Sequence, residues 1–383
     1  MRTMLILFFF SFCSDIKRPP LYSFLLSGGG TSELAGVISS DFGAGGRFTA
    51  VNADLLAASP SYASVHSDAV FRYFKRKVYI VNRLNRDSIL ILNRDLGFLA
   101  EKEFSVGAGT NPQDILAVSD SKAYVPLYGS TDLMTVDLGT GFISKRIYLG
   151  NYSESFSSGG APDGKPEMHT MIQYGSSAYL ILQRLDRNDL SGFPTPSSSS
   201  YLLEMDINTD AVKAVYTTPA PNPLGKMKIA DIFGEPHIII NMPGRLGFQS
   251  RLDGGIGAFS LNTKTFRQSF LLSEQTAGGD IMDFVIKSQT VGYAYVLDSS
   301  FNKFIVRFNP ENGTKSSILL YFPSSAGNIG GMALSKSGKL YIGDSSFSKP
   351  GVTVYNTDSS DQKLTPVPID VGLRPYDISV LED

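Results

Sequence analysis

Residues 111–141 read NPQDILAVSDSKAYVPLYGSTDLMTVDLGTG and contain three short apolar segments separated by polar turns. The first segment follows Asp114, the second is centred on Tyr124, and the third ends in the turn Asp137-Leu138-Gly139-Thr140-Gly141. Short runs rich in Val, Ile and Tyr that are bounded by Gly, Asn, Asp and Ser are typical of β-strands. The stretch therefore predicts consecutive strands.

The same pattern recurs along the whole chain. Tyrosine-centred strands are expected at 77–81, 123–125, 178–180, 294–296 and 339–342, and 236–239 takes the equivalent place in another unit. After each one comes a second apolar strand that closes in a polar turn. Repeats of about 45 to 60 residues built from short strands and Asn, Asp and Gly turns are typical of β-propeller blades.

A further set of segments has the pattern of innermost strands. They begin at Asp68, Asp114, His169, Asp231, Asp283, Gly331 and Asp377. The last segment ends the chain with no partner strand after it, and a lone strand cannot satisfy its edges. We therefore expect N-terminal strands at 33–38 and 47–56 to complete its sheet. Six complete units and this composite one predict an all-β chain, a β-propeller of seven blades with four antiparallel strands each, with six blades as the alternative.

One resemblance supports this interpretation. Residues 111–125 and 135–141 resemble the repeats of YVTN/YncE-type propellers. The similarity is clear in the second unit and fair in the fifth and sixth, and it extends over about two thirds of the chain. The resemblance implies the fold. It implies no single activity, because that superfamily includes surface proteins, binding modules and a few enzymes.

The composition limits the classes of partner. The chain has 383 residues, a net charge of −2 and 18% charged residues, with no long basic run. A surface that binds nucleic acid needs clustered Lys and Arg to neutralise phosphates, so we expect no nucleic-acid partner. One continuous repeat array also favours a single propeller domain over residues 29–383.

The N-terminus predicts export. A short basic start precedes the apolar run 4–12, which is too short to span a bilayer and has the pattern of a signal peptide over residues 1–12. The only cysteine, Cys13, follows directly, as in a bacterial lipoprotein signal, where it becomes lipidated. Residues 13–28 would then be a tether, and the protein would reach the bacterial cell envelope, contacting membrane only through its lipid anchor. A plain cleaved signal, or an incidental cysteine behind a misassigned start, is the alternative.

The polar residues at the predicted inner strand starts form the sharpest candidate site. They are Asp68, Asp114, His169, Asp231, Asp283 and Asp377. Around the mouth of a central channel they could hold a hard cation such as calcium, or a cationic or polyhydroxylated ligand. The structural alternative is that each aspartate accepts hydrogen bonds from nearby backbone amides. The three histidines lack metal-ligand spacing, so we expect no zinc site.

Three insertions interrupt the regular spacing, at 151–166, 184–200 and 243–254. In four-stranded blades these connections emerge on one face, beside the channel mouth, where repeat folds often place recognition. We expect a protein or a small polar ligand to bind this face of a monomer. Arginine and aromatic side chains are frequent interface residues, and the candidates are Arg184, Asp186, Arg187, Phe193, Arg245, Phe248 and Arg251.

An enzyme is the alternative from another class. A lyase or hydrolase at the channel mouth would use His169 as base, with Asp114 and Asp231 orienting it or holding a metal. Such a site requires His169 to be exposed and within hydrogen-bond reach of a carboxylate. If His169 is buried, this alternative loses its only base. A structural envelope component without a concave site is the third possibility.

Overall fold

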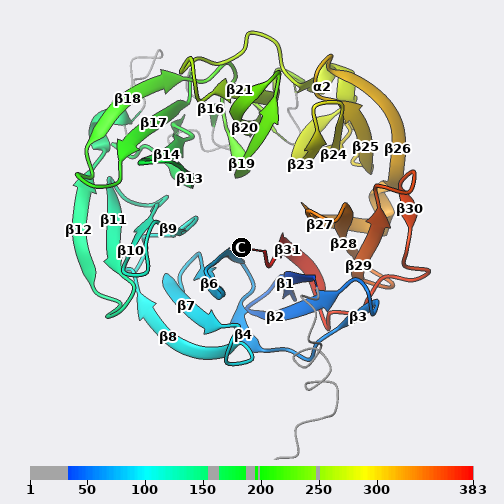
Figure 1. The fold of residues 1–383 in the computed structure, drawn as a ribbon, viewed down its shortest axis with the longest axis horizontal. Helices are drawn as coiled ribbons and strands as arrows, with labels where there is room; N and C mark the ends of the chain where they lie inside the picture. The colour runs from blue at the N-terminus through cyan, green and yellow to red at the C-terminus, as the bar shows by residue number, and fades with distance from the viewer. Residues whose placement is uncertain (1–32, 154–163, 187–194, 197–198, 247–250, 383) are drawn as a thin grey trace, which may run out of the picture.

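The computed structural model describes residues 33–153, 164–186, 195–196, 199–246 and 251–382. Seven antiparallel sheets stand around a central axis like the blades of a propeller (Figure 1). In the order from the axis outward, blade 1 consists of β31 (Arg374–Val380), β1 (Leu34–Ser40), β2 (Gly45–Asn52) and an edge shared by β3 (Ala57–Ala58) and β4 (Ala63–His66). The prediction of an all-β, seven-bladed β-propeller is confirmed.

Blades 2 to 7 follow in chain order, each with four strands from the axis outward. Blade 2 has β5 (Ala69–Phe74), β6 (Lys77–Asn82), β7 (Ser88–Asn93) and β8 (Leu99–Ser105). Blade 3 has β9 (Leu116–Ala117), β10 (Lys122–Val125), β11 (Asp132–Asp137) and β12 (Ile143–Tyr148). Blade 4 has β13 (Met168–Tyr174), β14 (Ser177–Leu182), β17 (Tyr201–Asp206) and β18 (Val212–Thr217).

The remaining three blades have the same order. Blade 5 has β19 (Leu224–Ile232), β20 (Glu235–Met242), β21 (Gly255–Ser260) and β22 (Leu272–Ser273). Blade 6 has β23 (Asp280–Ser288), β24 (Val291–Leu297), β25 (Lys303–Asn309) and β26 (Thr314–Phe322). Blade 7 has β27 (Gly327–Leu334), β28 (Lys339–Ser346), β29 (Gly351–Asn356) and β30 (Gln362–Lys363).

The two ends of the chain close the ring in blade 1, as the lone C-terminal strand predicted. β31 pairs with β1 in antiparallel register, with Ala35 opposite Val380 and Val37 opposite Ile378. Figure 1 shows the red C-terminal strand beside the dark blue N-terminal one. The second N-terminal strand is shorter than expected, since β2 ends at Asn52, whose side chain caps the turn that follows. Each terminal strand therefore pairs with backbone N–H and C=O groups that the other would otherwise leave without a partner.

The hydrophobic core lies between neighbouring blades. Buried side chains from β7, β10 and β14, such as Ile91, Val125 and Leu180, belong to one cluster that spans three blades. Burying one such side chain contributes roughly 1.5 to 3 kcal/mol. The outermost strands face solvent instead, and β12 is almost entirely exposed. This radial order explains why the tyrosine-centred second strands are the most apolar part of each repeat.

In blades 3, 6 and 7, a tyrosine of the second strand links the blade to the next one. The Tyr124 hydroxyl donates to Asp210 at 2.6 Å, and Tyr341 donates to Glu33 at 2.6 Å, in each case across a blade boundary. Tyr293 makes the same contact with Asp361. Burial, and then the hydrogen bond to the carboxylate, raises the pKa of Tyr124, so its hydroxyl remains a donor. The recurring tyrosine in the sequence is therefore a structural connection between blades.

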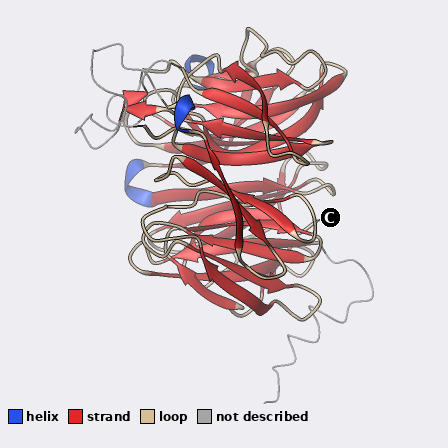
Figure 2. Ribbon diagram, turned by 90° about the vertical axis from the view of Figure 1, so that its left-hand side faces the viewer, coloured by secondary structure: helices blue, strands red, loops and turns tan. Residues whose placement is uncertain are grey.

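The two faces of the ring differ. The short helices η1 (Gly150–Tyr152), α2 (Glu274–Ala277) and η3 (Ser324–Ala326) all lie on the left in Figure 2, whereas the C-terminus lies on the right. The hairpin of β15 (Leu185–Asp186) and β16 (Thr195–Pro196) joins the second and third strands of blade 4, so it lies on the helix side. We call this side the insertion face. In the part of the chain that is described, no helix is long and apolar enough to cross a membrane.

Candidate functional site

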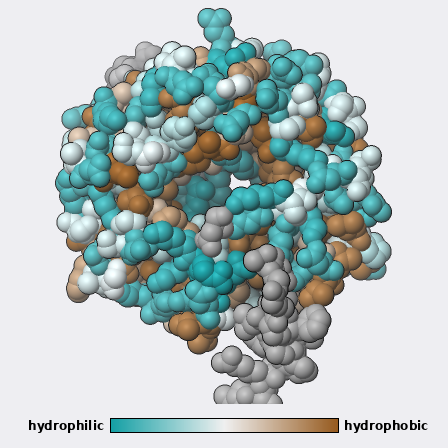
Figure 3. All heavy atoms as spheres, viewed as in Figure 1, coloured by the Kyte–Doolittle hydropathy of each residue, from teal (hydrophilic) through white to brown (hydrophobic). Residues whose placement is uncertain are grey.

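The inner strands enclose a cavity of about 690 Å³ along the axis of the ring. Figure 3 shows its opening on the face that carries the C-terminus. Polar side chains line both ends of the cavity. Arg83, Gln113 and His169 lie toward the insertion face, and we call this end the channel mouth. Lys336 and Glu382, which follow the ends of β27 and β31, lie toward the other face.

Four side chains near the starts of inner strands each connect their own blade to the following one. Asp114 accepts the Met171 backbone N–H at 2.9 Å, and His169 accepts that of Gly225 at 3.0 Å through Nε2. In the same way, Asp283 accepts from Met332 at 2.9 Å and Asp377 accepts from Phe71 at 3.0 Å. These contacts agree with the structural alternative, with the difference that all four amides belong to the next blade. His169 has the same role as the three aspartates, since it also accepts a backbone N–H of the following blade.

Blade 7 has no side chain at this position, because Gly330 and Gly331 stand there. A Cβ atom on Gly330 would lie 1.9 Å from the carbonyl oxygen of Pro375 in β31. Only glycine allows this close approach of two backbones. Blades 7 and 1 therefore meet here through backbone contact, whereas blades 1, 3, 4 and 6 each use an acceptor side chain toward the following blade.

The channel is not a ring of carboxylates, because cations pair with its aspartates. Arg72 binds Asp114 with two hydrogen bonds, Nε to Oδ1 at 2.7 Å and Nη2 to Oδ2 at 2.6 Å. Burial opposes the charge of Arg72, but the Asp114 carboxylate outweighs it and raises the pKa of the guanidinium. A planar guanidinium held by two parallel hydrogen bonds is a rigid pairing.

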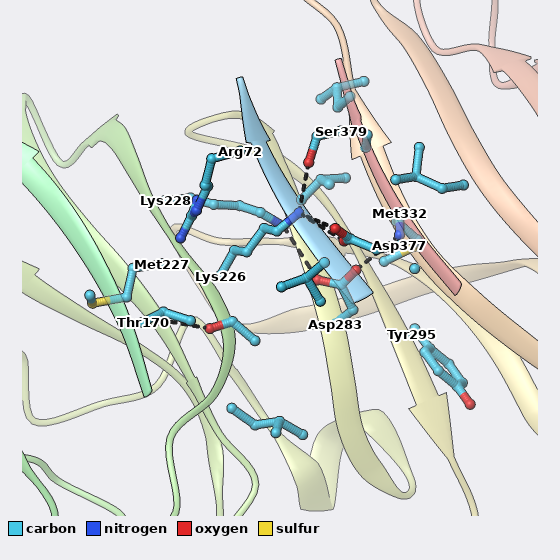
Figure 4. A pocket seen from close by; sticks show the side chains of 18 of the residues that line it. Arg72, Thr170, Lys226, Met227, Lys228, Asp283, Tyr295, Met332, Asp377 and Ser379 are labelled. Carbon is cyan, nitrogen blue, oxygen red and sulfur yellow. Dashed lines mark hydrogen bonds and ion pairs between the residues drawn. The ribbon is translucent and has the colours of Figure 1, made fainter. Parts of the chain in front are cut away.

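The second pair reaches across the axis. Lys226 of blade 5 extends to blade 1, where its Nζ donates to Asp377 at 2.7 Å and to Ser379 at 2.9 Å (Figure 4). Asp377 and Ser379 are two residues apart on β31, so they share one face of the strand. Burial lowers the pKa of Lys226 below its ordinary value, although Asp377 acts in the opposite direction. The Lys226 side chain therefore spans the channel from blade 5 to blade 1.

The third pair is looser. Lys228 lies on β19 two residues after Lys226, and its Nζ lies 3.4 Å from Asp283. Tyr295 and Met332 line the cavity beside Asp283 (Figure 4). The sequence interpretation missed all three cations. The available signal was the alternating pair of lysines at 226 and 228, which lies in an inner strand once β19 is correctly placed.

The prediction for Asp231 is wrong. β19 begins at Leu224, so Asp231 lies near its end, paired with Pro236 at the turn into β20. Asp231 is exposed, and the strand carries it to the end of the ring opposite His169. The reason lies in the spacing. The 62-residue interval from His169 to Asp231 was the longest in the array, and the true strand start comes seven residues earlier.

Asp68 lies at the mouth directly before β5, outside the row of blade-linking acceptors. Its Oδ1 accepts from Arg83 Nη2 at 2.5 Å and from the Tyr376 hydroxyl at 2.5 Å. Arg83 also donates to Gln113 at 3.1 Å. Asp68 therefore holds a polar network that joins blades 1, 2 and 3 at the channel mouth.

His169 is not placed as a general base. Only 7% of its surface is exposed, and its Nε2 lone pair accepts the Gly225 N–H. The neutral ring therefore carries its proton on Nδ1, which has no hydrogen-bond partner among the described residues. Burial, with the positive charges of Arg83 and Arg72, lowers the pKa of His169 to about 4. The enzyme alternative therefore lacks the exposed base that it requires.

The structure gives no support to a calcium site at this position. Within the described residues, no three His, Cys, Asp or Glu side chains come close enough to hold a metal ion. Asp231 lies at the wrong end of its strand, and Asp114 and Asp377 already neutralise Arg72 and Lys226. To bind at Asp114 or Asp377, a metal cation would have to displace the guanidinium of Arg72 or the ammonium group of Lys226.

The insertion residues have varied environments. Arg184 is 4% exposed, and its guanidinium donates to the carbonyl oxygens of Tyr152, Ser153 and Ser199 and stacks on the Tyr201 ring at 3.8 Å. Arg184 therefore joins two insertions and does not face a partner, contrary to expectation. Three further candidates are described, and three lie outside the described residues. Arg251 is exposed and Arg245 and Asp186 are half-buried, whereas Arg187, Phe193 and Phe248 are the candidates outside the described ranges.

Comparison with known proteins agrees with the fold. No family model matches the chain, and no curated protein does either. Among solved structures, a putative 6-phosphogluconolactonase from Bacteroides uniformis is similar with a TM-score of 0.60 and 15% identity, covering 91% of this chain and 99% of that one. A protein from Lactobacillus plantarum (TM-score 0.57, 10% identity, 92% and 100% covered) and AztD from Citrobacter koseri (0.53, 12%, 91% and 98%) are similar as well.

These likenesses define the class of protein by fold. Each of these structures is at most 15% identical to the chain, so the likeness shows the fold alone. The chain is a seven-bladed β-propeller. Its function must be argued from its own channel and surfaces.

Proposed function

We propose that the protein is an extracytoplasmic, lipid-anchored binding module that takes up a small polyhydroxylated ligand in its central channel. The observation that carries this proposal is the cavity of about 690 Å³ lined by paired charges. Cavities of roughly 300 to 1,000 Å³ with a few convergent polar groups are typical small-molecule sites.

The pairing of the charges favours hydroxyl groups in the ligand. Arg72, Lys226 and Lys228 each face a carboxylate, so a ligand with one bare charge would have to break an existing ion pair. A hydroxyl group can donate to a carboxylate and accept from an ammonium at once. Sugars and cyclitols present several such groups on a rigid ring without a bare charge, and their carbon faces can contact Met227 or Ile329 in the same cavity.

The termini fit a lipid anchor that leaves the insertion face free. β1 and β31 are antiparallel, so Glu33 before β1 and Glu382 after β31 both lie on the face opposite the insertions. A tether from lipidated Cys13 through residue 28 would enter the domain from that side. A monomer anchored in this way in the bacterial cell envelope would turn the insertion face away from the membrane.

The proposal is tested by thermal melting of the full chain in mild detergent. The panel consists of glucose, galactose, N-acetylglucosamine, gluconate, glucuronate and myo-inositol, with calcium and EDTA as separate additions. A ligand that binds only the folded state raises the melting temperature by mass action, by RT ln(1 + [L]/Kd) in free energy. We expect a shift with at least one polyhydroxylated compound. A shift with calcium alone would replace this proposal by a metal site.

Lys226→Gln identifies the site. This change removes the ammonium group and should abolish the ligand-dependent shift, because Lys226 reaches through the channel from blade 5 to Asp377 and Ser379 of blade 1. Asp231→Asn is the matched control, since Asp231 is exposed at the far end of β19. An equal ligand shift in wild type and Lys226→Gln would place the ligand elsewhere.

A further inference from the structure

A cluster of aromatic and arginine side chains stands on the insertion face, on blades 7 and 1. The Arg374 guanidinium lies 4.5 Å from the centre of the Phe42 ring and 5.7 Å from that of Phe347. Phe42 lies in the turn between β1 and β2, and Phe347 directly follows β28. We call Phe42, Arg374 and Phe347 the Phe-Arg rim. The insertions lie on blades 4 and 5 and between blades 3 and 4, so this is a different sector of the face.

Both phenylalanine side chains of the rim are exposed to solvent. Phe347 is 70% exposed and Phe42 is 50% exposed. Phe42 also adopts φ 58°, in the left-handed region that large side chains rarely enter. The neighbouring Gly43 could adopt that conformation without strain.

The cation of the rim has no anion of its own. Within the described residues, the Arg374 guanidinium donates no hydrogen bond and forms no ion pair, although cation–π contact with two rings partly removes it from water. The acidic residue beside Phe42, Asp41, accepts instead from the N–H groups of Gly43 and Gly45 at 2.7 and 3.0 Å. Lys349, two residues after Phe347, is exposed and adds positive charge.

The rim is continuous with the channel mouth. The Phe42 ring meets the edge of Tyr376 at 6.0 Å, and the Tyr376 hydroxyl donates to Asp68. Arg83 bonds both of them. A partner seated on the rim would therefore also cover the entry to the channel on the insertion face.

We propose that the Phe-Arg rim docks a protein partner through an acidic side chain that stands beside an apolar one. The carboxylate would accept from the free edge of the Arg374 guanidinium, which matches a carboxylate with two parallel hydrogen bonds. The apolar neighbour would pack between Phe42 and Phe347. Aromatic and arginine residues carry much of the binding energy in protein interfaces, and an unpaired cation selects an anionic partner.

The test uses the full chain in mild detergent and an array of immobilised twelve-residue peptides. One set carries Glu flanked by Phe or Leu, a second set has Gln in place of Glu, and a third has Ala in place of the apolar residue. We expect binding to the first set, at least tenfold weaker binding to the other two, and at least a tenfold loss with Phe347→Ala and with Arg374→Gln. Arg374→Lys should recover part of the binding, because it keeps the charge but not the fork of donors.

Phe142→Ala is the matched control, since Phe142 is 75% exposed in the turn between β11 and β12 and lies outside the rim. It should leave binding unchanged. Equal binding of the Glu and Gln sets would overturn the proposal. So would tighter binding of polygalacturonate, which would make the occupant a polysaccharide, or self-association that Phe347→Ala abolishes, which would make it a second copy of the chain. The peptide assay is read without a channel ligand and no rim residue lines the cavity, so its failure is distinguishable from failure of ligand binding in the channel.

Discussion

Asp114 should be the most important single polar side chain for the stability of the ring. It is 2% exposed and accepts two hydrogen bonds from Arg72 at 2.7 and 2.6 Å. It also accepts the N–H groups of Met171 in the next blade and of Ile115, both at 2.9 Å. Asp114→Ala removes all four hydrogen bonds at once and leaves the guanidinium of Arg72 without a carboxylate.

The expected loss follows from that geometry. Removing one partner of a buried ion pair costs roughly 3 to 5 kcal/mol. Since the side chain of Arg72 is 24% exposed, water can compensate part of the loss, and we expect about 3 kcal/mol. At roughly 2.1 cal/mol/K of unfolding entropy per residue, that free energy lowers the melting temperature of a chain of 383 residues by about 4 °C.

Calorimetry of wild type, Asp114→Ala and Asp231→Ala measures this difference. Asp231→Ala is the control, because Asp231 is exposed near the end of β19 and should change the melting temperature by less than about 1 °C. Equal melting temperatures for all three proteins would refute the role of Asp114 as a link between blades. Equal losses in the two variants would show that the loss of any carboxylate has this effect.

Three further predictions concern a tyrosine between blades, the buried histidine and the lipid anchor. Tyr341→Phe removes the hydrogen bond to Glu33 and should lower the free energy of unfolding in urea by about 1 kcal/mol, whereas Tyr148→Phe, at an exposed position, should not. Because the folded pKa of His169, about 4, lies below the unfolded value of about 6.5, the unfolded chain binds the proton first as pH falls. Stability present above pH 6.5 is therefore lost toward pH 4, by up to about 3 kcal/mol, and His169→Gln should abolish that part of the pH dependence; an unchanged slope would contradict the burial of a neutral ring. Finally, Cys13→Ser should release the folded protein from the membrane fraction, and continued membrane retention would contradict the lipid anchor.

The fold could be predicted because every blade buries the apolar side chains of its second strand in the same way. The second strand is buried between neighbouring sheets in every blade, and in blades 2, 3, 4, 6 and 7 it carries a buried tyrosine, so the same apolar pattern recurs along the chain. The composite blade followed from a simple physical argument, namely that the strand after Pro375 needs partners. The boundary errors fall where local signals compete, as at Asp231, which resembled a strand start but lies near the end of β19, opposite Pro236.

The chemistry of the site was only partly predictable. Spacing placed Asp114, Asp283 and Asp377 near the axis, but it could not show that cations from other blades neutralise them. Lys226 reaches Asp377 across 151 positions of the chain, and no local pattern records such a contact. Arg184 illustrates the opposite error, because an arginine in an insertion suggested an interface, whereas its guanidinium binds three backbone carbonyl groups.

The most direct test of the account is titration calorimetry of the full chain with the polyhydroxylated compound that gives the largest melting shift. The account predicts one bound molecule per chain, affinity reduced at least tenfold by Lys226→Gln, and no change with Asp231→Asn. Melting of each variant without ligand establishes that it is folded. Absence of binding by every compound of the panel, or equal affinity in wild type and Lys226→Gln, would contradict the claim that the paired charges of the channel form the binding site.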